Sequence, residues 1–168
     1  MSGKREIASD TGPLITLEKL SDGYRFIRLL YDRIIIPPIV LDELVQGQFV
    51  SHQAYLEHYG VEDLLQVVET RSNLDVPGGE LLDAGERGAI LVALERELPL
   101  LIEEEAGRQF ARSLGLQISG IAGQVVKAFR AGLISSREAQ DKLRELFEAG
   151  RINRKIYTAL AETVRQGG

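Results

Sequence analysis

Acidic side chains stand where apolar, strand-like runs end or where helices of small residues begin. Asp10, Glu43, Glu86, Glu103 and Glu104 all occupy such positions. In an open α/β sheet the carboxyl ends of the strands face the ligand crevice, so acids at those ends are expected to gather there. Gathered carboxylates repel one another, which raises their pKa values unless a cation relieves the repulsion. Because Mg²⁺ and Mn²⁺ are hard ions that select oxygen ligands, the pattern indicates a divalent-metal site.

The elements that must position these acids are predicted by short apolar runs that alternate with helical patterns. The run Ile34-Ile35-Ile36 is β-branched and uniformly apolar, which is typical of a buried parallel strand. A long helix is predicted from Leu82 to Leu98, with Asp83 as its N-cap and Glu86 at the capping-box position. The alternation of strand and helix predicts the α/β class, with a doubly wound and largely parallel sheet. Strands are expected at 6–9, 34–36, 65–68, 100–102 and 117–119.

The strand pattern stops at Ser135, and two helices are predicted beyond it. Residues 135–138 give a helix-start signal, and Asn153 is expected to cap the final helix. We expect residues 1–134 to form the α/β domain and residues 135–168 to form a helical tail of that same domain. Something must cover the apolar face of the first tail helix, which consists of Ala139, Leu143, Leu146 and Phe147.

Composition excludes several classes of protein. The chain of 168 residues has no Cys, which excludes disulfides, thiolate catalysis and Cys-based zinc sites. Its two histidines, His52 and His58, are six residues apart on a predicted helix, which argues against a His-centred triad or a zinc pair. There is no Walker-type glycine loop. No secretory pattern or membrane-spanning run is found, so we expect a cytoplasmic protein with no membrane contact.

The net charge of −5 argues against a generic nucleic-acid coat, which would be basic overall. It does not exclude an enzyme that acts on nucleic acid, because a carboxylate-rich metal site contributes negative charge of its own.

Several motifs in order resemble the PIN-domain superfamily, and more closely a prokaryotic, toxin-like branch of small PIN proteins. The resemblance spans nearly the whole chain. The motifs are SDTGPLI at 9–15, IPP at 36–38 with DEL at 42–44, LDAGE at 82–86, LIEE at 101–104 with GR at 107–108, the segment 120–132, and GRI at 150–152.

This resemblance implies an α/β/α sandwich with a mostly parallel central sheet and a C-terminal helical hairpin. It also implies an acidic cluster that binds Mg²⁺ or Mn²⁺ and hydrolyses RNA, often as the toxin of a toxin–antitoxin pair. RNA would then be the substrate, a cognate antitoxin protein a partner, and a homodimer the expected assembly.

Carried over by position, the catalytic acids are Asp10, Glu43, Glu86, and Glu103 or Glu104. The resemblance makes Asp10 the central metal ligand, with Glu86 and the fourth acid completing the metal site. Glu43 would bind the metal through water or orient the attacking water. Bound metal can lower the pKa of a water, orient it for in-line attack and offset charge on the leaving oxygen.

Three further residues are expected to contact substrate. Thr11 holds the place where many family members carry a hydroxyl beside the first acid. Arg108 and Arg112 are four residues apart on one face of a predicted helix, where they would hold phosphates. The sequence departs from the branch at Glu103, where Asp is usual. The extra methylene places the carboxylate about 1.5 Å farther out, and Mg²⁺ tolerates such a shift poorly.

Each of these assignments has a structural alternative. Asp10 is also a suitable helix cap, and Glu86 is the natural capping-box partner of Asp83. Acids at 103–105 suit the positive end of a helix dipole. Asp42 and Glu43 also fit a solvated helix face, and the two arginines fit exposed or intrahelical roles.

Other functions therefore stay open. The first is a catalytically impaired PIN-like module that binds RNA or a protein partner, which a loss of Mn²⁺-dependent RNA cleavage would reveal. The second is a metal-dependent phosphoesterase for a small substrate, which would have an enclosed pocket. A receiver-like signalling domain is less compatible, because such a domain would carry a Lys after its last strand, where this chain has Ser119-Gly120.

Overall fold

Short apolar runs form the strands of a parallel sheet whose two faces are both buried. Successive side chains on a strand point to opposite faces, so Ile34 and Ile36 contact one apolar core while Ile35 contacts the other. A computed structural model describes residues 3–71 and 78–167. Its strands are β1 (Glu6–Ser9), β2 (Arg33–Ile36), β3 (Leu65–Val67), β4 (Leu100–Leu101) and β5 (Ile118–Ser119).

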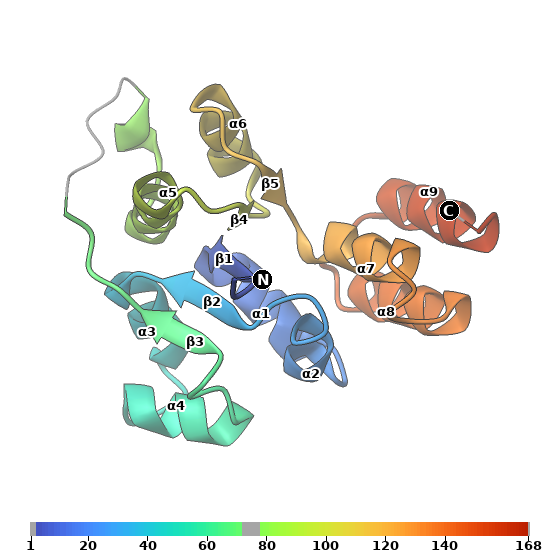
Figure 1. Cartoon of the computed structure of the whole chain (residues 1–168), viewed down its shortest axis with the longest axis horizontal. Coiled ribbons are helices and arrows are strands. Elements are labelled where there is room, and N and C mark those ends of the chain that lie inside the picture. The colour runs from blue at the N-terminus through green and yellow to red at the C-terminus, as the bar shows by residue number, and fades with distance from the viewer. Residues whose placement is uncertain (1–2, 72–77, 168) are drawn as a thin grey trace.

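Helices cover both faces of this sheet, as Figure 1 shows. The α5 and α6 helices pack on one face, and the helices from the amino-terminal half, joined by α7 and α8, pack on the other. The helices are α1 (Thr11–Lys19), α2 (Gly23–Ile27), α3 (Pro38–Val45), α4 (His52–Tyr59), the short 3₁₀ helix η1 (Gly79–Leu81), α5 (Ala84–Arg96), α6 (Glu105–Ser113), α7 (Ile121–Arg130), α8 (Ser136–Glu148) and α9 (Arg154–Arg165).

The sheet order is β3-β2-β1-β4-β5, and every pair of neighbouring strands is parallel. The predicted α/β class, the parallel sheet and the three-layer sandwich are therefore confirmed. Most of the predicted helices and strands have boundaries within two residues of the observed ones. The long helix is shorter than predicted, because Asp83 caps its start and Glu97 takes a left-handed backbone conformation (φ 55°) at its end.

The C-terminal helices pack on the chain's own α/β core. Ala139, Leu143 and Leu146 of α8 are fully buried in the same cluster as Leu14 and Leu17 of α1. Both predicted caps are found, with Ser135 and Glu138 forming a reciprocal capping box and Asn153 accepting from the Ile156 N–H. The covering of the apolar face, left open by the sequence, is thus supplied by α1, α7 and α9.

A partly buried ion pair also joins the tail to α2. Lys142 is 7% exposed, and its Nζ lies 2.8 and 2.9 Å from the two carboxylate oxygens of Asp22. The same Nζ lies 5.3 Å from the centre of the Phe26 ring. Loss of Asp22 would leave the buried Lys142 ammonium without its counter-charge, so this contact favours one fixed position for α8.

The turn between α1 and α2 gives a stability prediction. A Cβ added at Gly23 would lie 1.8 Å from the carbonyl oxygen of Leu17, which is a backbone atom and cannot rotate away. We expect Gly23→Ala to lower the free energy of unfolding by about 1–3 kcal/mol, measured by urea denaturation. Gly12→Ala is the matched control, since Gly12 lies in the first turn of α1 with no atom within 4 Å of the added carbon. Equal stability of the two variants would contradict this account of the turn.

Candidate active site

The strand order reverses between β1 and β4, and this reversal determines where the acids meet. Ligands of doubly wound sheets bind outside the carboxyl ends of the strands at such a switch point. Asp10 directly follows β1, and its N–H donates to the carbonyl oxygen of Leu101 in β4 at 3.0 Å. Glu103 follows β4 at the same end of the sheet. The topology therefore brings Asp10 and Glu103 to the same end of the sheet.

Asp10 is a buried carboxylate, with only 6% of its surface exposed. It occupies the N-cap position of α1, but its side chain makes no capping hydrogen bond. Burial, together with the charges of Asp83, Glu86 and Glu43, raises the pKa of Asp10 from 3.8 to about 7, against the opposing effect of the Thr11 amide. A carboxylate in this environment gains from a cation more than from a cap.

Thr11 positions the second acid. Its Oγ1 donates to Oε1 of Glu43 at 2.6 Å, which joins the start of α1 to α3. A Cβ added at Gly85 would lie 2.2 Å from that Glu43 oxygen and 3.3 Å from Oδ1 of Asp10. The absence of a side chain at Gly85 therefore makes room for both carboxylates beside the first turn of α5.

Glu86 uses one carboxylate oxygen to cap the start of α5, and its other oxygen has no hydrogen-bond partner among the described residues. Its Oε1 accepts from the Asp83 N–H at 3.1 Å, and Asp83 Oδ1 accepts from the Glu86 N–H at 2.7 Å, which confirms the predicted capping box. Glu86 Oε2 is buried and has no hydrogen-bond partner among the described residues. Burial, with the charges of Asp83 and Glu104, raises the pKa of Glu86. A buried acceptor without a donor is costly, and a bound ion is one explanation for it.

The structure separates the two candidates for the fourth acid. The Glu103 carboxylate is held by three groups of the protein: Oε1 accepts from Thr16 Oγ1 at 2.7 Å and lies 3.8 Å from an Arg151 nitrogen, while Oε2 accepts from the Ile121 N–H at 3.0 Å. Glu104 is exposed at the N-cap of α6, makes no cap bond, and is close enough to raise the pKa of Glu86. Glu104 is therefore the better placed of the pair to complete a site with Glu86.

Two positions near the site were not selected by the sequence reasoning. Arg151, in the α8–α9 turn, donates from Nε to Thr16 Oγ1 at 2.8 Å and from a terminal nitrogen to the Gly12 carbonyl oxygen at 3.2 Å. Asp83 was given only a capping role, yet its charge acts on both Asp10 and Glu86. The spacing of Asp83 and Glu86 on one helix turn was the available signal for Asp83, whereas Arg151 was noted only within the GRI motif at 150–152, which does not indicate its contacts.

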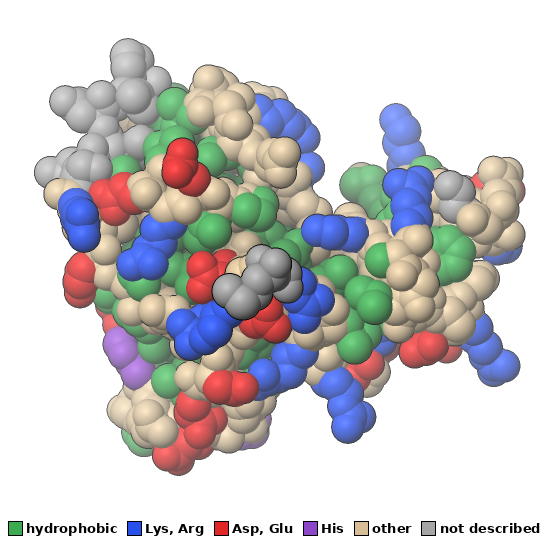
Figure 2. Space-filling view, in the orientation of Figure 1, with side chains coloured by type: hydrophobic (Ala, Val, Ile, Leu, Met, Phe, Trp, Pro, Cys, Tyr) green, Lys and Arg blue, Asp and Glu red, His purple; other side chains and the backbone are tan. Residues whose placement is uncertain are grey.

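Arg108 and Arg112 line one groove, as their shared helix face predicted. The groove has a volume of about 450 Å³ and lies between α6 with β5 and α7 with α9, where Arg151 also lines it. Figure 2 shows a notch between the regions of α6 and α9, with Lys and Arg side chains on both sides. Arg108 donates to the carbonyl oxygen of Ile102 at 2.8 Å, while Arg112 is exposed.

The acids do not form a closed coordination shell. Within residues 3–71 and 78–167, no three Asp, Glu or His side chains lie close enough together to hold one ion between them. The groups whose donor atoms suit a cation are the Asp10 carboxylate and the unpaired Oε2 of Glu86, with Glu43 beside Asp10. Outside the site, His52 Nε2 lies 2.6 Å from Oδ1 of Asp42.

The raised pKa of Asp10 predicts how stability depends on pH. The folded state holds the Asp10 proton up to about pH 7, while the unfolded state releases it near 3.8. Between these values the folded protein binds more protons, so stability falls as pH rises. We expect Asp10→Asn, which cannot ionise, to gain about 1.4 kcal/mol over wild type per pH unit in this window. Urea denaturation of both proteins at pH 5, 6, 7 and 8 measures it, and a difference that stays constant with pH would contradict the burial of Asp10.

The comparison with protein families defines the class. The family model DUF3368, described as a PIN domain, matches residues 6–166, which spans the sheet, the acids and the helical tail. This chain belongs to the PIN-domain family, whose members are generally nucleases.

Comparison with solved structures gives a distant likeness. A PilT N-terminus domain protein from the hyperthermophilic archaeon Sulfolobus solfataricus is 13% identical, with a TM-score of 0.48, and the match covers 69% of this chain and 87% of that chain. No curated protein matches the sequence. No helix within residues 3–71 and 78–167 is long and apolar enough to cross a membrane.

Proposed function

We propose that this PIN-domain protein is an endoribonuclease that uses Mg²⁺ or Mn²⁺ to hydrolyse phosphodiester bonds of RNA. The observation that carries the proposal is the Asp10 carboxylate, which is 6% exposed and lies at the switch point of the sheet. Burial, with smaller contributions from three nearby acids, raises its pKa to about 7. Perturbed pKa values of this kind are typical of functional sites.

The donor set fits a hydrated hard cation. Mg²⁺ is commonly bound through one or two carboxylates and keeps several of its waters, so the lack of a three-carboxylate group in the described residues is compatible with Asp10 and Glu86 as direct ligands. The unpaired Glu86 Oε2 is the second support. When bound, the ion would lower the pKa of a water and offset negative charge on the phosphodiester.

The chain's own residues would supply the remaining functions. Glu43, which accepts a hydrogen bond from Thr11, would orient a water beside Asp10 and accept its proton. Arg108 and Arg112 would hold phosphates in the groove beside the acids, since arginine binds phosphate through paired hydrogen bonds. Glu104 would add negative charge next to Glu86, and Glu103 would act through its contacts to Thr16 and Ile121 rather than on the ion.

The test is cleavage of end-labelled single-stranded RNA by the purified full chain. We expect cleavage with Mn²⁺ or Mg²⁺ and none after addition of EDTA, with activity restored by excess metal. Cleavage that is unaffected by EDTA would contradict the metal-dependent mechanism, and an inactive protein would contradict the proposed activity.

A specific observation favours one alternative, a PIN-like module that binds RNA or a protein without cleaving it. Glu103, which stands where the family branch has Asp, is already held by Thr16, the Ile121 N–H and Arg151. If this position is needed for a second ion, the chain binds but does not cleave. RNA binding with no cleavage in either metal would select this alternative.

The partners implied by the family are part of the proposal. A toxin role predicts a homodimer and a cognate antitoxin protein that inhibits cleavage. Light scattering after size-exclusion chromatography measures the dimer directly. A single-subunit mass at all concentrations tested would contradict it.

A further inference from the structure

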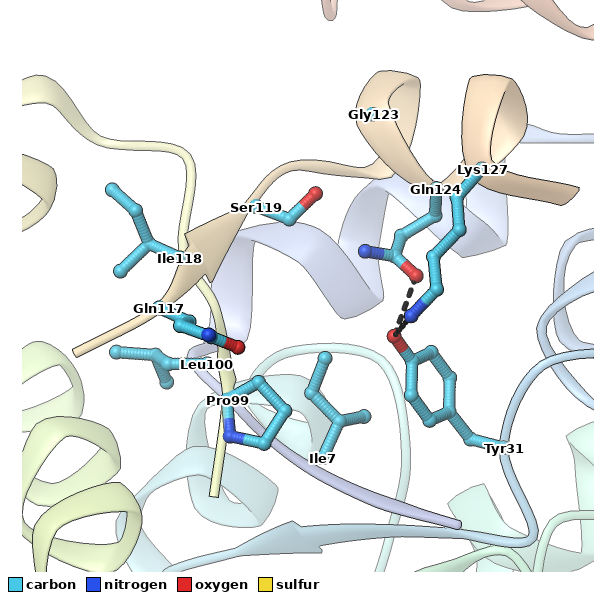
Figure 3. A pocket seen from close by; sticks show the side chains of 10 residues that line it. All are labelled: Ile7, Tyr31, Pro99, Leu100, Gln117, Ile118, Ser119, Gly123, Gln124 and Lys127. Atoms are coloured by element: carbon cyan, nitrogen blue, oxygen red, sulfur yellow. Dashed lines mark hydrogen bonds between the residues drawn. The ribbon is translucent and has the colours of Figure 1, made fainter. Parts of the chain in front are cut away.

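A cavity adjoins the arginine-lined groove along the seam between β5 and α7. It has a volume of about 210 Å³ and lies toward the amino ends of β1 and β4, away from the acids. Ile118, Ser119 and Gly123 line both spaces, so the cavity and the groove are neighbours on one seam. Figure 3 shows the cavity between β5 on one side and Gln124 and Lys127 of α7 on the other. None of its polar groups has a part in the proposed cleavage site.

A chain of hydrogen bonds fixes one donor at the cavity wall. Lys127 Nζ donates to the Tyr31 hydroxyl at 3.2 Å, and the Tyr31 hydroxyl donates to Oε1 of Gln124 at 2.8 Å. Because an ammonium group only donates, the hydroxyl must pass its own proton on, which requires the oxygen of the Gln124 amide to face Tyr31. The hydrogen-bond network therefore fixes which end of the Gln124 amide faces Tyr31.

The other end of that amide is unused. Gln124 is 4% exposed and Tyr31 is 5% exposed, so both are locked in position. Nε2 of Gln124 has no hydrogen-bond partner among the described residues. Figure 3 shows it directed toward Ser119 and the interior of the cavity. Because the amide is fixed and its Nε2 faces the cavity, its two N–H donors can bind a ligand that offers an acceptor.

The rest of the lining suits a flat ring. Ile7, Pro99, Leu100 and Ile118 give apolar surface, and Ser119 Oγ, which donates to the Gly120 carbonyl at 3.0 Å, keeps lone pairs to accept from a ligand. With a volume of about 210 Å³, the cavity has room for one small ring system. Apolar faces with a polar edge are the features of a nucleobase, and extruded bases are read in this way.

Two observations define the ligand further. Glutamine pairs with adenine through both its oxygen and its nitrogen, and here the oxygen is taken by Tyr31. Only the N–H donors remain, and they suit the carbonyl oxygen of uracil or guanine, which stands beside a ring N–H that Ser119 Oγ can accept. Cytosine has no ring N–H beside its carbonyl oxygen, and adenine has no carbonyl oxygen and would accept only through a ring nitrogen. The adjoining groove carries Arg108, Arg112 and Arg151, which suit the phosphates of the same strand.

We propose that the cavity formed by Tyr31, Gln124, Lys127 and Ser119 binds one uracil or guanine base of a single-stranded RNA whose phosphates lie in the arginine-lined groove. The inference rests on the proposed function for its substrate class. It adds a base-selective subsite that lies apart from the acids.

Nuclear magnetic resonance titration of the ¹⁵N-labelled full chain tests the proposal in EDTA, where no metal-dependent cleavage occurs. The ligands are UMP, GMP, AMP and inorganic phosphate. We expect UMP or GMP to shift the amide signals of residues 117–119 and 123–127, with AMP at least about tenfold weaker. Equal binding of AMP, no nucleotide binding, or shifts by phosphate alone would each overturn the proposal.

Variants separate the subsite from the fold. Gln124→Met keeps the side-chain length, removes the donors and is expected to weaken UMP or GMP binding about tenfold. Lys127→Met is a second test in case Gln124→Met fails to fold, because Lys127 lies at an exposed position. It removes the donor that orients the Tyr31 hydroxyl and should also weaken UMP or GMP binding. Lys155→Met is the matched control, since Lys155 is exposed on α9 with no side-chain partner in the described chain. Unchanged binding in both cavity variants would overturn the proposal.

A further arm distinguishes RNA from a free nucleotide. A uridine or guanosine tetranucleotide should bind more tightly than the mononucleotide and should also shift the amide signals of residues 105–112. Equal affinity of the two ligands would identify a free-nucleotide site and overturn the RNA proposal. Base binding without cleavage by the wild type would contradict the proposed function alone, whereas cleavage with no base preference would contradict the subsite alone.

Discussion

Asp10→Asn is expected to lower the rate of RNA cleavage by at least about a hundredfold while making the folded protein more stable. Changes to groups that only support a metal ligand already lower metal affinity or activity 10–100-fold. Asp10 and Glu86 are the most buried of the clustered acids, each with 6% of its surface exposed. The neutral amide also removes the repulsion from Asp83, Glu86 and Glu43 that raises the Asp10 pKa. Single-turnover cleavage rates and urea denaturation at pH 8 measure the two effects.

The opposite directions of these effects make the result specific. A structural acid would lose stability on substitution, whereas a catalytic acid held in an unfavourable environment gains stability and loses activity. Asp141→Asn is the control, because Asp141 is about half exposed and pairs with Arg144 on α8. It should change neither quantity measurably, since surface ion pairs contribute little.

Metal binding gives an independent readout of the same substitution. Calorimetry should detect Mn²⁺ binding to the wild type and not to Asp10→Asn, and Mn²⁺ should raise the unfolding temperature of the wild type alone. Full activity in Asp10→Asn would show that the site is elsewhere. Activity lost together with a large loss of stability would show that Asp10 is a structural residue.

Patterns with a short period allowed most of the fold to be predicted. The β-branched run at 34–36 is buried on both faces as a parallel strand, because alternate side chains must meet apolar helices on either side. The capping boxes at Asp83 and Ser135 were readable because a cap depends on residues three positions apart. Local rules of this kind need no knowledge of the distant chain.

The partners of the acids could not be predicted, because they depend on contacts between distant segments. Arg151 meets Thr16 across 135 residues, and together they hold Glu103. A sequence pattern can place an acid at a strand end, but it cannot show which oxygen will already be hydrogen-bonded. The roles of Thr11, Arg108 and Arg112 toward substrate stay predictions for the same reason, although Thr11 is now seen to hold Glu43.

Gly85→Ala is expected to leave the fold intact and to lower the cleavage rate about ten- to hundredfold. The added methyl would lie 2.2 Å from Oε1 of Glu43 and 3.3 Å from Oδ1 of Asp10, and both are side-chain atoms that can move. Alanine is favoured over glycine in a helix by about 1 kcal/mol, which offsets the cost of moving Glu43. Cleavage rates and urea denaturation of the variant measure the two quantities.

Thr11→Val tests whether the displaced Glu43 causes that loss. Valine removes the hydroxyl that donates to Glu43 at 2.6 Å and keeps a similar shape. If both substitutions act by releasing the same carboxylate, the double variant should be little slower than the slower single variant, because one interaction cannot be lost twice. Losses that multiply in the double variant would mean that Gly85→Ala acts on Asp10 instead. A fully active Gly85→Ala would exclude Glu43 from the catalytic group, and the proton-accepting role would then have to be assigned to another acid of the site.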